Sequence, residues 1–196
     1  MKTKYLGKKT GSQTLDYSPD LLDSVHRSQN KKFHFYGVDY WNAYEFSFLD
    51  SSNQPVLESI EIKIPLDSSY TVESKSLKIY LASFYKRKFK NSINAYKLIE
   101  RDLSNLINSN VVVRKKIKYD TPPKSTLING LSKTIKKNTV IRYKGFRSIC
   151  PVTSQPDWAN IYLHSTTNSL DSKKFIKILK SFRERGDFHE ACIDSI

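Results

Sequence analysis

The strongest secondary-structure signal in the chain is the segment Tyr44-Glu45-Phe46-Ser47-Phe48-Leu49-Asp50-Ser51-Ser52-Asn53-Gln54-Pro55-Val56-Leu57-Glu58-Ser59-Ile60-Glu61-Ile62-Lys63-Ile64. Apolar residues occupy every second position at both ends of this segment, which is the period of a strand with one buried face. The middle, from Asp50 to Pro55, has the composition of a turn. We therefore predict two strands within residues 36–71. Tyr44, Phe46 and Phe48 alternate along the first, and Ile60, Ile62 and Ile64 face inward on the second, with Ser59, Glu61 and Lys63 outward.

Outward from this hairpin the apolar period becomes helical. A first helix is predicted from Glu73, with the apolar stripe Leu77, Tyr80, Leu81 and Phe84. A second helix follows, with Ala95, Ile99, Leu103 and Leu106 facing inward. Residues 111–119 return to a strand pattern, and another strand is expected near residues 139–143, after the break at Pro122 and Pro123. The predicted order is strand, strand, helix, helix, strand, strand.

The same order restarts near the end of the chain. Residues 159–164 have a strand pattern, and residues 173–185 have a helical one, with Phe175, Leu179 and Phe182 on one face. A further helix is expected to begin near His189. We predict an α+β fold with one complete module, residues 1–145, followed by an incomplete copy, residues 146–196.

Net charge leaves several kinds of partner open. The chain has 196 residues with 33 Lys and Arg against 19 Asp and Glu, a formal net charge of +14. Such an excess is compatible with nucleic acid, a membrane surface or a phosphorylated small molecule. The charges are dispersed over residues 86–90, 114–118, 133–137 and 173–185, however, and dispersed lysines are typical of solvated faces.

Cysteine and histidine content argues against a disulfide scaffold and against a zinc site. Two cysteines are too few for a disulfide framework, which favours a reducing compartment. The four histidines are scattered, without the spacing of zinc ligands. No apolar run resembles a signal peptide or reaches the length of a membrane span. We expect a cytoplasmic protein without a metal.

One short segment carries the elements of covalent chemistry. In Cys150-Pro151-Val152-Thr153-Ser154-Gln155-Pro156-Asp157, a thiol and a carboxyl lie seven residues apart on a stretch stiffened by two prolines. A thiolate is a strong nucleophile and a carboxyl can transfer protons, so the pair predicts attack on an electrophilic carbon. The alternative interpretation is a buried structural Cys150 in an ordinary turn, with Asp157 as a turn cap.

Four segments in this order resemble the QueF family, the NADPH-dependent 7-cyano-7-deazaguanine reductases of queuosine biosynthesis. These segments are Glu73-Ser74-Lys75-Ser76-Leu77-Lys78-Ile79-Tyr80-Leu81, Cys150-Pro151 through Pro156-Asp157-Trp158, Ser181-Phe182-Arg183, and Phe188-His189-Glu190-Ala191-Cys192. The segments Phe35-Tyr36-Gly37-Val38-Asp39-Tyr40-Trp41 and Tyr44-Glu45 also look like the amino-terminal half of the two-module branch of that family. The resemblance runs from about Leu6 to the end of the chain.

The resemblance implies a fold, a reaction and a set of site residues. The family has the tunnelling fold (T-fold), in which each module is an antiparallel sheet with two helices. Its reaction reduces a nitrile to a primary amine with two NADPH, in a homodimer, without direct nucleic acid binding or membrane attachment. The implied residues are Cys150 as nucleophile and Asp157 as general acid; Val72, Glu73, Ser74, His189 and Glu190 for substrate; and Ser74 and Lys75 for NADPH.

These assignments have structural alternatives. Glu73 and Ser74 are also ordinary residues for the first turn of a helix. His189 and Glu190 stand at an expected helix start, where an acidic residue is favoured by the helix dipole. Cys192 is expected to be an inert core residue.

The sequence departs from the family pattern at its end. The family continues past His189-Glu190 with further strands and an Arg-Gly-Gly segment that helps to hold NADPH, and this chain has no such segment. We therefore expect a chain truncated at its C-terminus. Two other functions stay open: a related T-fold enzyme of pterin or deazapurine metabolism, such as a zinc-dependent cyclohydrolase, and an inactive truncated remnant with a basic RNA-binding surface.

Overall fold

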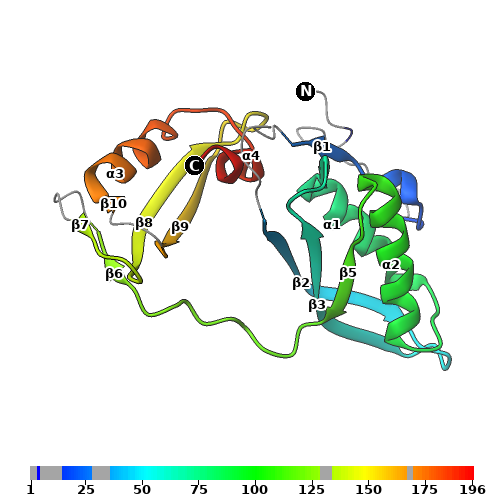
Figure 1. Cartoon of the computed structure of the whole chain (residues 1–196). Helices are drawn as coiled ribbons and strands as arrows, with labels where there is room; N and C mark the ends of the chain where they lie inside the picture. Colours follow the sequence, from blue (N-terminus) through cyan, green and yellow to red (C-terminus); the bar gives the residue numbers. More distant parts are fainter. Residues whose placement is uncertain (1–3, 5–14, 28–35, 129–133, 167–169) are drawn as a thin grey trace. The chain divides into compact units, whose positions relative to one another are not determined.

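The computed structural model describes residue 4 and residues 15–27, 36–128, 134–166 and 170–196 (Figure 1). The chain divides into two compact units, unit 1 from Met1 to Tyr119 and unit 2 from Asp120 to Ile196. Both units combine helices with small sheets whose strand pairs are antiparallel, except for one parallel pair in unit 2. The predicted α+β class is confirmed.

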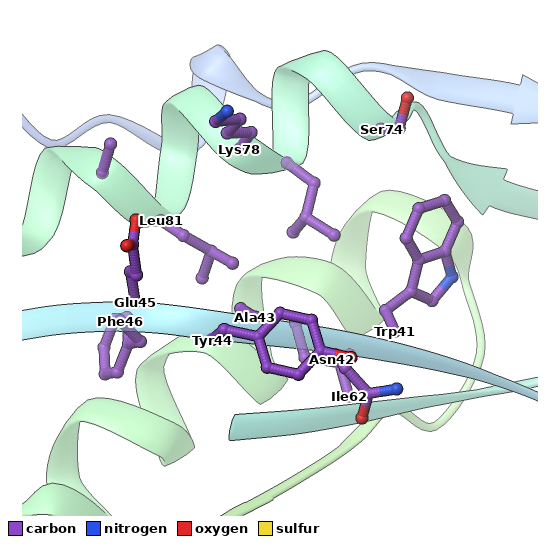
Figure 2. A pocket seen from close by; sticks show the side chains of 12 residues that line it. Trp41, Asn42, Ala43, Tyr44, Glu45, Phe46, Ile62, Ser74, Lys78 and Leu81 are labelled. Carbon is purple, nitrogen blue, oxygen red and sulfur yellow. The ribbon is translucent and has the colours of Figure 1, made fainter. Parts of the chain in front are cut away.

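Unit 1 is built on a three-stranded antiparallel sheet of order β2-β3-β5. A two-stranded sheet of β1 and β4 precedes the helices. The elements are η1 (Pro19–Leu21), β1 (Ser24–His26), β2 (Val38–Leu49), β3 (Pro55–Pro65), β4 (Tyr70–Val72), α1 (Ser74–Ala82), η2 (Ser83–Lys86), α2 (Ser92–Ile107) and β5 (Val112–Lys115). Helix α1 lies over strand β2 (Figure 2).

The turn between β2 and β3 has the predicted chemistry. The Asp50 carboxylate accepts hydrogen bonds from the backbone N–H groups of Ser52, at 2.8 Å, and Gln54, at 2.9 Å. Asn53 has a φ of 62°, a left-handed conformation that asparagine tolerates better than most residues. The local sequence therefore supplies the hydrogen bonds that close this turn.

The alternation along β2 is interrupted by a bulge. Ala43 pairs with Ile60 and Phe46 pairs with Glu58, so two residues of β2, Tyr44 and Glu45, stand opposite one residue of β3. Phe46 and Phe48 are 1% exposed, whereas Tyr44 is 58% exposed. Placing Tyr44 on the same inward face as Phe46 and Phe48 is therefore wrong, because the bulge changes which side chains point toward the core.

Strand β3 has the predicted inward residues, but one of its predicted outward residues is unexpectedly buried. Ile60, Ile62 and Ile64 are fully buried, as predicted, but Glu61 on the opposite face is also buried. Its carboxylate lies 2.6 Å from Arg114 Nη2 and 2.7 Å from Lys116 Nζ. The hydrogen bond from Lys116, followed by that from Arg114, holds the pKa of Glu61 below its usual value. Glu61 is thus buried because two cations from β5 and the residue after it cover it.

The core of unit 1 lies between the sheet and its helices. The predicted stripe of α1 is buried at all four positions, and the last of them, Phe84, lies in η2. Ala95, Ile99 and Leu103 of α2 are fully buried, and Leu106 packs partly against the same core. Asn91 caps the start of α2 by accepting a hydrogen bond from Asn94 N–H at 3.0 Å. These helices therefore form as the periodicity predicts.

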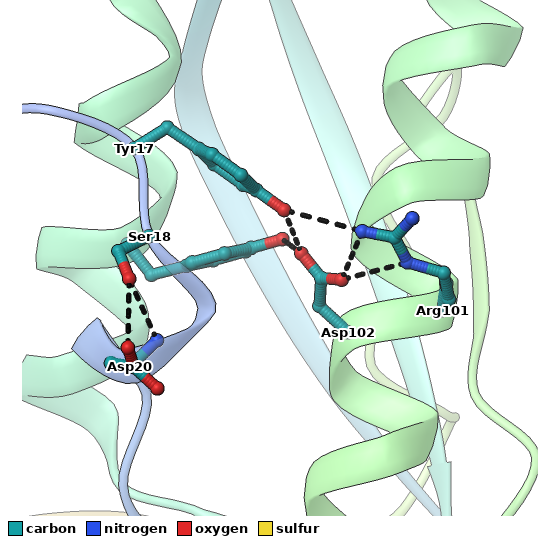
Figure 3. A network of polar contacts seen from close by, with 6 residues as sticks. Tyr17, Ser18, Asp20, Arg101 and Asp102 are labelled. Atoms are coloured by element: carbon teal, nitrogen blue, oxygen red, sulfur yellow. Dashed lines mark hydrogen bonds and ion pairs between the residues drawn. The ribbon is translucent and has the colours of Figure 1, made fainter.

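A buried carboxylate joins three segments of unit 1. Asp102 of α2 accepts hydrogen bonds from the hydroxyls of Tyr17, at 2.5 Å, and Tyr80 of α1, at 2.7 Å (Figure 3). The neighbouring Arg101 lies 2.9 Å from the other carboxylate oxygen. Burial and the bond to Asp102 raise the pKa of both tyrosines above the usual value. The network therefore fixes the segment before η1 and helix α1 to helix α2.

We expect Asp102→Ala to lower the free energy of unfolding of unit 1 by about 2–4 kcal/mol. The substitution removes the acceptor of two tyrosine hydroxyls and leaves these partly or fully buried donors without that hydrogen bond. Amide hydrogen exchange in α2 measures the effect within unit 1. The matched control is Asp20→Ala, because the hydrogen bond that the Asp20 carboxylate accepts from the Ser18 hydroxyl is exposed to solvent. An equal loss of protection in both variants would contradict the role assigned to Asp102.

Unit 2 contains a three-stranded sheet of order β6-β8-β9 and a short pair of β7 with β10. Its elements are β6 (Thr126–Leu127), β7 (Thr134–Ile135), β8 (Val140–Ile149), β9 (Pro156–His164), β10 (Leu170–Asp171), α3 (Ser172–Ser181) and α4 (His189–Ser195). Strands β8 and β9 are antiparallel, and β6 joins β8 in parallel. Leu179 and Phe182 are buried as predicted, and Phe175 packs partly against the same core.

The strand predicted near residues 139–143 exists but belongs to unit 2. It is the first half of β8, where Val140 pairs with His164 of β9. The structural division after Tyr119 therefore lies earlier in the chain than the predicted module boundary at residue 145. Strand β5 ends at Lys115 instead of Tyr119, and Pro122 and Pro123, which lack N–H donors, lie in an exposed segment without regular structure.

Candidate functional site

The candidate nucleophile lies at the closed end of the β8–β9 hairpin. Cys150 follows the last residue of β8, and its N–H donates to Gln155 O at 2.8 Å. Its carbonyl accepts from Ser154 N–H at 3.0 Å, and Ser154 has a φ of 57°. Residues 150–155 thus form a short hydrogen-bonded loop that we call the cysteine loop.

Cys150 and Asp157 share one face of this hairpin. The register pairs Ser148 with Asp157 and Ile149 with Pro156, and the bond from Cys150 to Gln155 continues the ladder by one pair. Because side chains alternate along a strand, Ser148, Cys150 and Asp157 lie on the same side. Diagonal neighbours on such a face have Cα atoms about 7–8 Å apart. Both Cys150 and Asp157 are half-buried. This face of the hairpin is therefore partly open to solvent at the thiol.

A distant segment of unit 2 packs against the cysteine loop. Ile149 N–H donates to Arg185 O at 3.0 Å, and Ile149 forms an isolated bridge with Gly186. A Cβ at Gly186 would meet Pro151 Cα at 3.8 Å, which is van der Waals contact. Helix α4 begins three residues later, at His189. The backbone therefore brings the start of α4 to the neighbourhood of the thiol, although the side chains of His189 and Glu190 lie outside the described part of the structure.

The two cysteines occupy different environments. Cys150 is half-buried, whereas Cys192 of α4 is fully buried in the core of unit 2, and neither forms a disulfide. The prediction that Cys192 is a core residue is confirmed. Only Cys150 is placed where a small molecule can meet a thiol.

The Glu73-Ser74-Lys75-Ser76 motif forms the start of helix α1. Glu73 is the N-cap of α1, and its buried carboxylate accepts 2.8 Å hydrogen bonds from the N–H groups of Lys75 and Ser76. Glu73 N–H donates to Asp23 O at 2.9 Å, and Ser76 Oγ accepts from Asp23 N–H at 3.0 Å. The alternative interpretation of Glu73 as a first-turn helix residue therefore holds for this structure.

The other predicted residues of the motif have unequal access to a ligand. Val72 is 1% exposed in the core of unit 1, so only its backbone can face a ligand. Ser74 is exposed at the first position of α1, and Lys75 is partly buried. Val72, Glu73, Ser74 and Lys75 are thus gathered within unit 1, while Cys150 and Asp157 are gathered within unit 2.

A cavity of about 530 Å³ lies between β2 and α1 (Figure 2). Ser74 stands at one end, and Lys78 follows one turn later on the same helix. Trp41, Tyr44 and Glu45 contribute from β2, over an apolar floor that includes Ile62, Leu77 and Leu81. This volume is within the range of small-molecule sites, and aromatic walls with a few charged groups suit a planar polar ring.

Sequence reasoning assigned no role to Tyr44, Glu45 or Lys78 at this cavity. Tyr44 and Glu45 lie in the bulge of β2. A bulge is an irregularity in the pairing of two strands, and the apolar period of one strand does not reveal it. Lys78 was within the quoted motif, and its spacing of four from Ser74 places both on one side of a helix. That spacing was the signal available in the sequence.

The described residues contain no group of three or more His, Cys, Asp and Glu side chains that could hold a metal ion. None of the helices in the described ranges is both long enough and apolar enough to cross a membrane.

The half-buried cysteine and the carboxyl on one hairpin face of this α+β chain are groups that a thiol enzyme would require. Comparison with known proteins makes the class specific. Residues 14–115 match a family model described as "Nitrile reductase, 7-cyano-7-deazaguanine-reductase N-term". This match ends four residues before the end of unit 1.

Similar proteins that are named as 7-cyano-7-deazaguanine reductases align with most of the chain. The NADPH-dependent 7-cyano-7-deazaguanine reductase of Coxiella burnetii (strain Dugway 5J108-111) is 34% identical over 95% of this chain and 77% of that relative. The enzymes of the same name from Buchnera aphidicola and Desulfotalea psychrophila are 33% and 32% identical, over 83% and 97% of this chain and 71% and 80% of the relatives. The chain belongs to the family of the 7-cyano-7-deazaguanine reductases.

Proposed function

We propose that this protein is an NADPH-dependent nitrile reductase that converts 7-cyano-7-deazaguanine to 7-aminomethyl-7-deazaguanine, a step of queuosine biosynthesis for tRNA modification. Family membership supports the activity. The observation that carries the proposal on this chain is the placement of Cys150 and Asp157 on one face of the β8–β9 hairpin. The related cyclohydrolase and the inactive RNA-binding remnant are less well supported, because the relatives are named as reductases.

Cys150 is proposed as the nucleophile. A nitrile carbon accepts hydride slowly, but addition of a thiolate forms a carbon–sulfur bond and turns the C≡N triple bond into the C=N bond of a thioimide, which accepts hydride more readily. The half-buried position of Cys150 supports this role, since the thiol is reachable yet partly shielded from water.

Asp157 is proposed as the general acid. As the thiolate adds to the nitrile carbon, negative charge develops on the nitrile nitrogen, and the Asp157 carboxyl delivers a proton there and becomes a carboxylate. Its position on the face shared with Cys150 supports this role.

Substrate binding is assigned to Glu190 and His189, together with Glu73, Ser74 and the backbone of Val72. A deazaguanine edge presents N–H donors, and carboxylates accept two such donors in one plane. The backbone bridge between Ile149 and Gly186 and the hydrogen bond from Ile149 N–H to Arg185 O support a position of α4 beside the thiol. The Glu73 carboxylate accepts hydrogen bonds from the N–H groups of Lys75 and Ser76 and, at 3.4 Å, from the Ser74 hydroxyl. A carboxylate has about four acceptor positions, so about one is left for a ligand.

NADPH is proposed to bind with Ser74 and Lys75, in part within the cavity between β2 and α1. When bound, NADPH supplies the hydride for each reduction step. The cavity fits one ring of such a cofactor by its volume and its aromatic walls, and Lys78 offers a positive charge near Ser74. The residues of the chain would hold the cofactor and exclude water, while Cys150 keeps the reacting carbon in place.

The finer structural expectations are part of the same proposal. We infer a tunnelling fold with two modules, whose second module is represented by β8, β9, α3 and α4. We also infer a homodimer in the cytoplasm that binds a small molecule and does not bind nucleic acid directly. The antiparallel sheets with helices in both units support the fold assignment.

A stoichiometric assay tests the proposed activity. We expect two NADPH to be oxidised for each 7-cyano-7-deazaguanine consumed, with 7-aminomethyl-7-deazaguanine as the product, because a nitrile needs four electrons to become an amine. NADPH absorbance and product mass give the two numbers. The matched control is guanine, which lacks the nitrile and should cause no oxidation. Nitrile-independent oxidation, or none with the nitrile, would contradict the proposal.

A further inference from the structure

A buried hydroxyl without a partner lies beside the proposed catalytic pair. Ser148 is 0% exposed, and among the described residues its Oγ has no hydrogen-bond partner. A buried polar group without a partner costs free energy, and most buried hydroxyls in folded proteins are hydrogen-bonded. Ser148 therefore needs an explanation that the resting structure does not supply.

The register places this hydroxyl opposite the proposed acid. Ser148 is the direct cross-strand partner of Asp157, and it precedes Cys150 by two residues on the same face. Cross-strand partners have Cβ atoms about 5 Å apart, so rotation about χ1 brings a hydroxyl and a carboxylate to hydrogen-bond distance. Phe146, two residues earlier on this face, is 2% exposed and part of the core. Ser148 thus stands between the core and the thiol.

We infer that Ser148 is a positioning residue for Asp157, an inference that rests on the proposed function. When Asp157 delivers its proton to the nitrile nitrogen, the new carboxylate accepts a hydrogen bond from the Ser148 hydroxyl. No covalent bond to Ser148 forms or breaks, and its proton stays on the hydroxyl oxygen. Because this hydrogen bond forms as charge develops, it lowers the barrier without tightening substrate binding.

The role predicts that stability and rate respond to Ser148→Ala in different ways. The substitution removes a buried hydroxyl that has no partner, so the unfolding midpoint should stay unchanged or rise. The rate of adduct formation between Cys150 and 7-cyano-7-deazaguanine should fall about tenfold to a hundredfold, the scale of one hydrogen bond to a charged group. Timed quenching followed by intact mass spectrometry measures this rate.

Two controls make the result specific. Thr71→Val removes another buried hydroxyl without a partner, Oγ1 of Thr71 in unit 1, and should leave the rate unchanged. Substrate affinity is measured in the Cys150→Ala background, where Ser148→Ala should change the dissociation constant by less than about twofold.

Each outcome supports or overturns the inference. A slower adduct in a variant that is at least as stable as the parent supports it. An unchanged rate overturns it, and so does a lower unfolding midpoint together with a slower rate, because the hydroxyl would then be structural. If the parent chain itself forms no adduct, the proposed function fails first, and the role of Ser148 fails with it.

Discussion

Cys150→Ala is expected to abolish adduct formation with 7-cyano-7-deazaguanine. Addition of a thiol to a nitrile releases no leaving group, so intact mass spectrometry of the parent chain should show an increase equal to the mass of the whole substrate. Without the thiol no covalent intermediate can form, and turnover should fall by about 10⁴-fold or more, the scale on which covalent enzymes lose activity with their nucleophile.

The second cysteine provides the matched control for this prediction. Cys192 is fully buried in the core of unit 2, whereas Cys150 is half-buried on the cysteine loop. Cys192→Ala should therefore keep the adduct and the turnover of the parent chain. An adduct that survives Cys150→Ala, or one that maps to Cys192, would remove Cys150 from the role of nucleophile.

Asp157→Asn is expected to slow adduct formation by about 10²-fold or more, the usual contribution of a positioned general acid. An amide has nearly the shape of the carboxyl but cannot deliver a proton to the nitrile nitrogen. Binding of the substrate before the reaction should change little, and its affinity is measured by titration of the Cys150→Ala chain with and without Asp157→Asn.

Glu184→Gln is the matched control for Asp157→Asn, because it also replaces a carboxyl of unit 2 with an amide. The Glu184 side chain is 82% exposed and pairs with Arg147, and exposed ion pairs of this kind contribute little to stability. We expect the parental rate for this variant. If Asp157→Asn also forms the adduct at the parental rate, another group must protonate the nitrogen.

The candidate site was only partly predictable from the sequence. The resemblance of the Cys150 to Asp157 segment to the family supplied the nucleophile and the acid, and the hairpin register then placed both on one face. Ser148 gave no signal, because its importance rests on being buried without a partner, and burial depends on segments far away in the chain. The cavity beside Ser74 was hidden for the same reason, since it is formed between β2 and α1.

By itself the sequence determined the type of nearly every long element and its inward face. The period of two in β3, the turn at Asp50 and the helical stripe from Leu77 to Phe84 are local properties, because the side chains that a backbone period aligns are within a few residues of each other. The helix start near Glu73 was also local, since the Glu73 carboxylate caps the N–H groups of the residues two and three positions later.

Only the tertiary structure decided how the strands outside the β2–β3 hairpin pair and which polar groups are buried. The sequence of β8 predicts a strand but does not say to which unit the strand belongs. Its pairing with β9 places it in unit 2. Glu61 is outward by its period and yet buried, because Arg114 and Lys116 reach it from β5 and the residue that follows. Likewise, the backbone bridge between Ile149 and Gly186 joins residues that lie far apart in the sequence. Pairing and burial are set by contacts between residues distant in sequence, and no local period encodes those contacts.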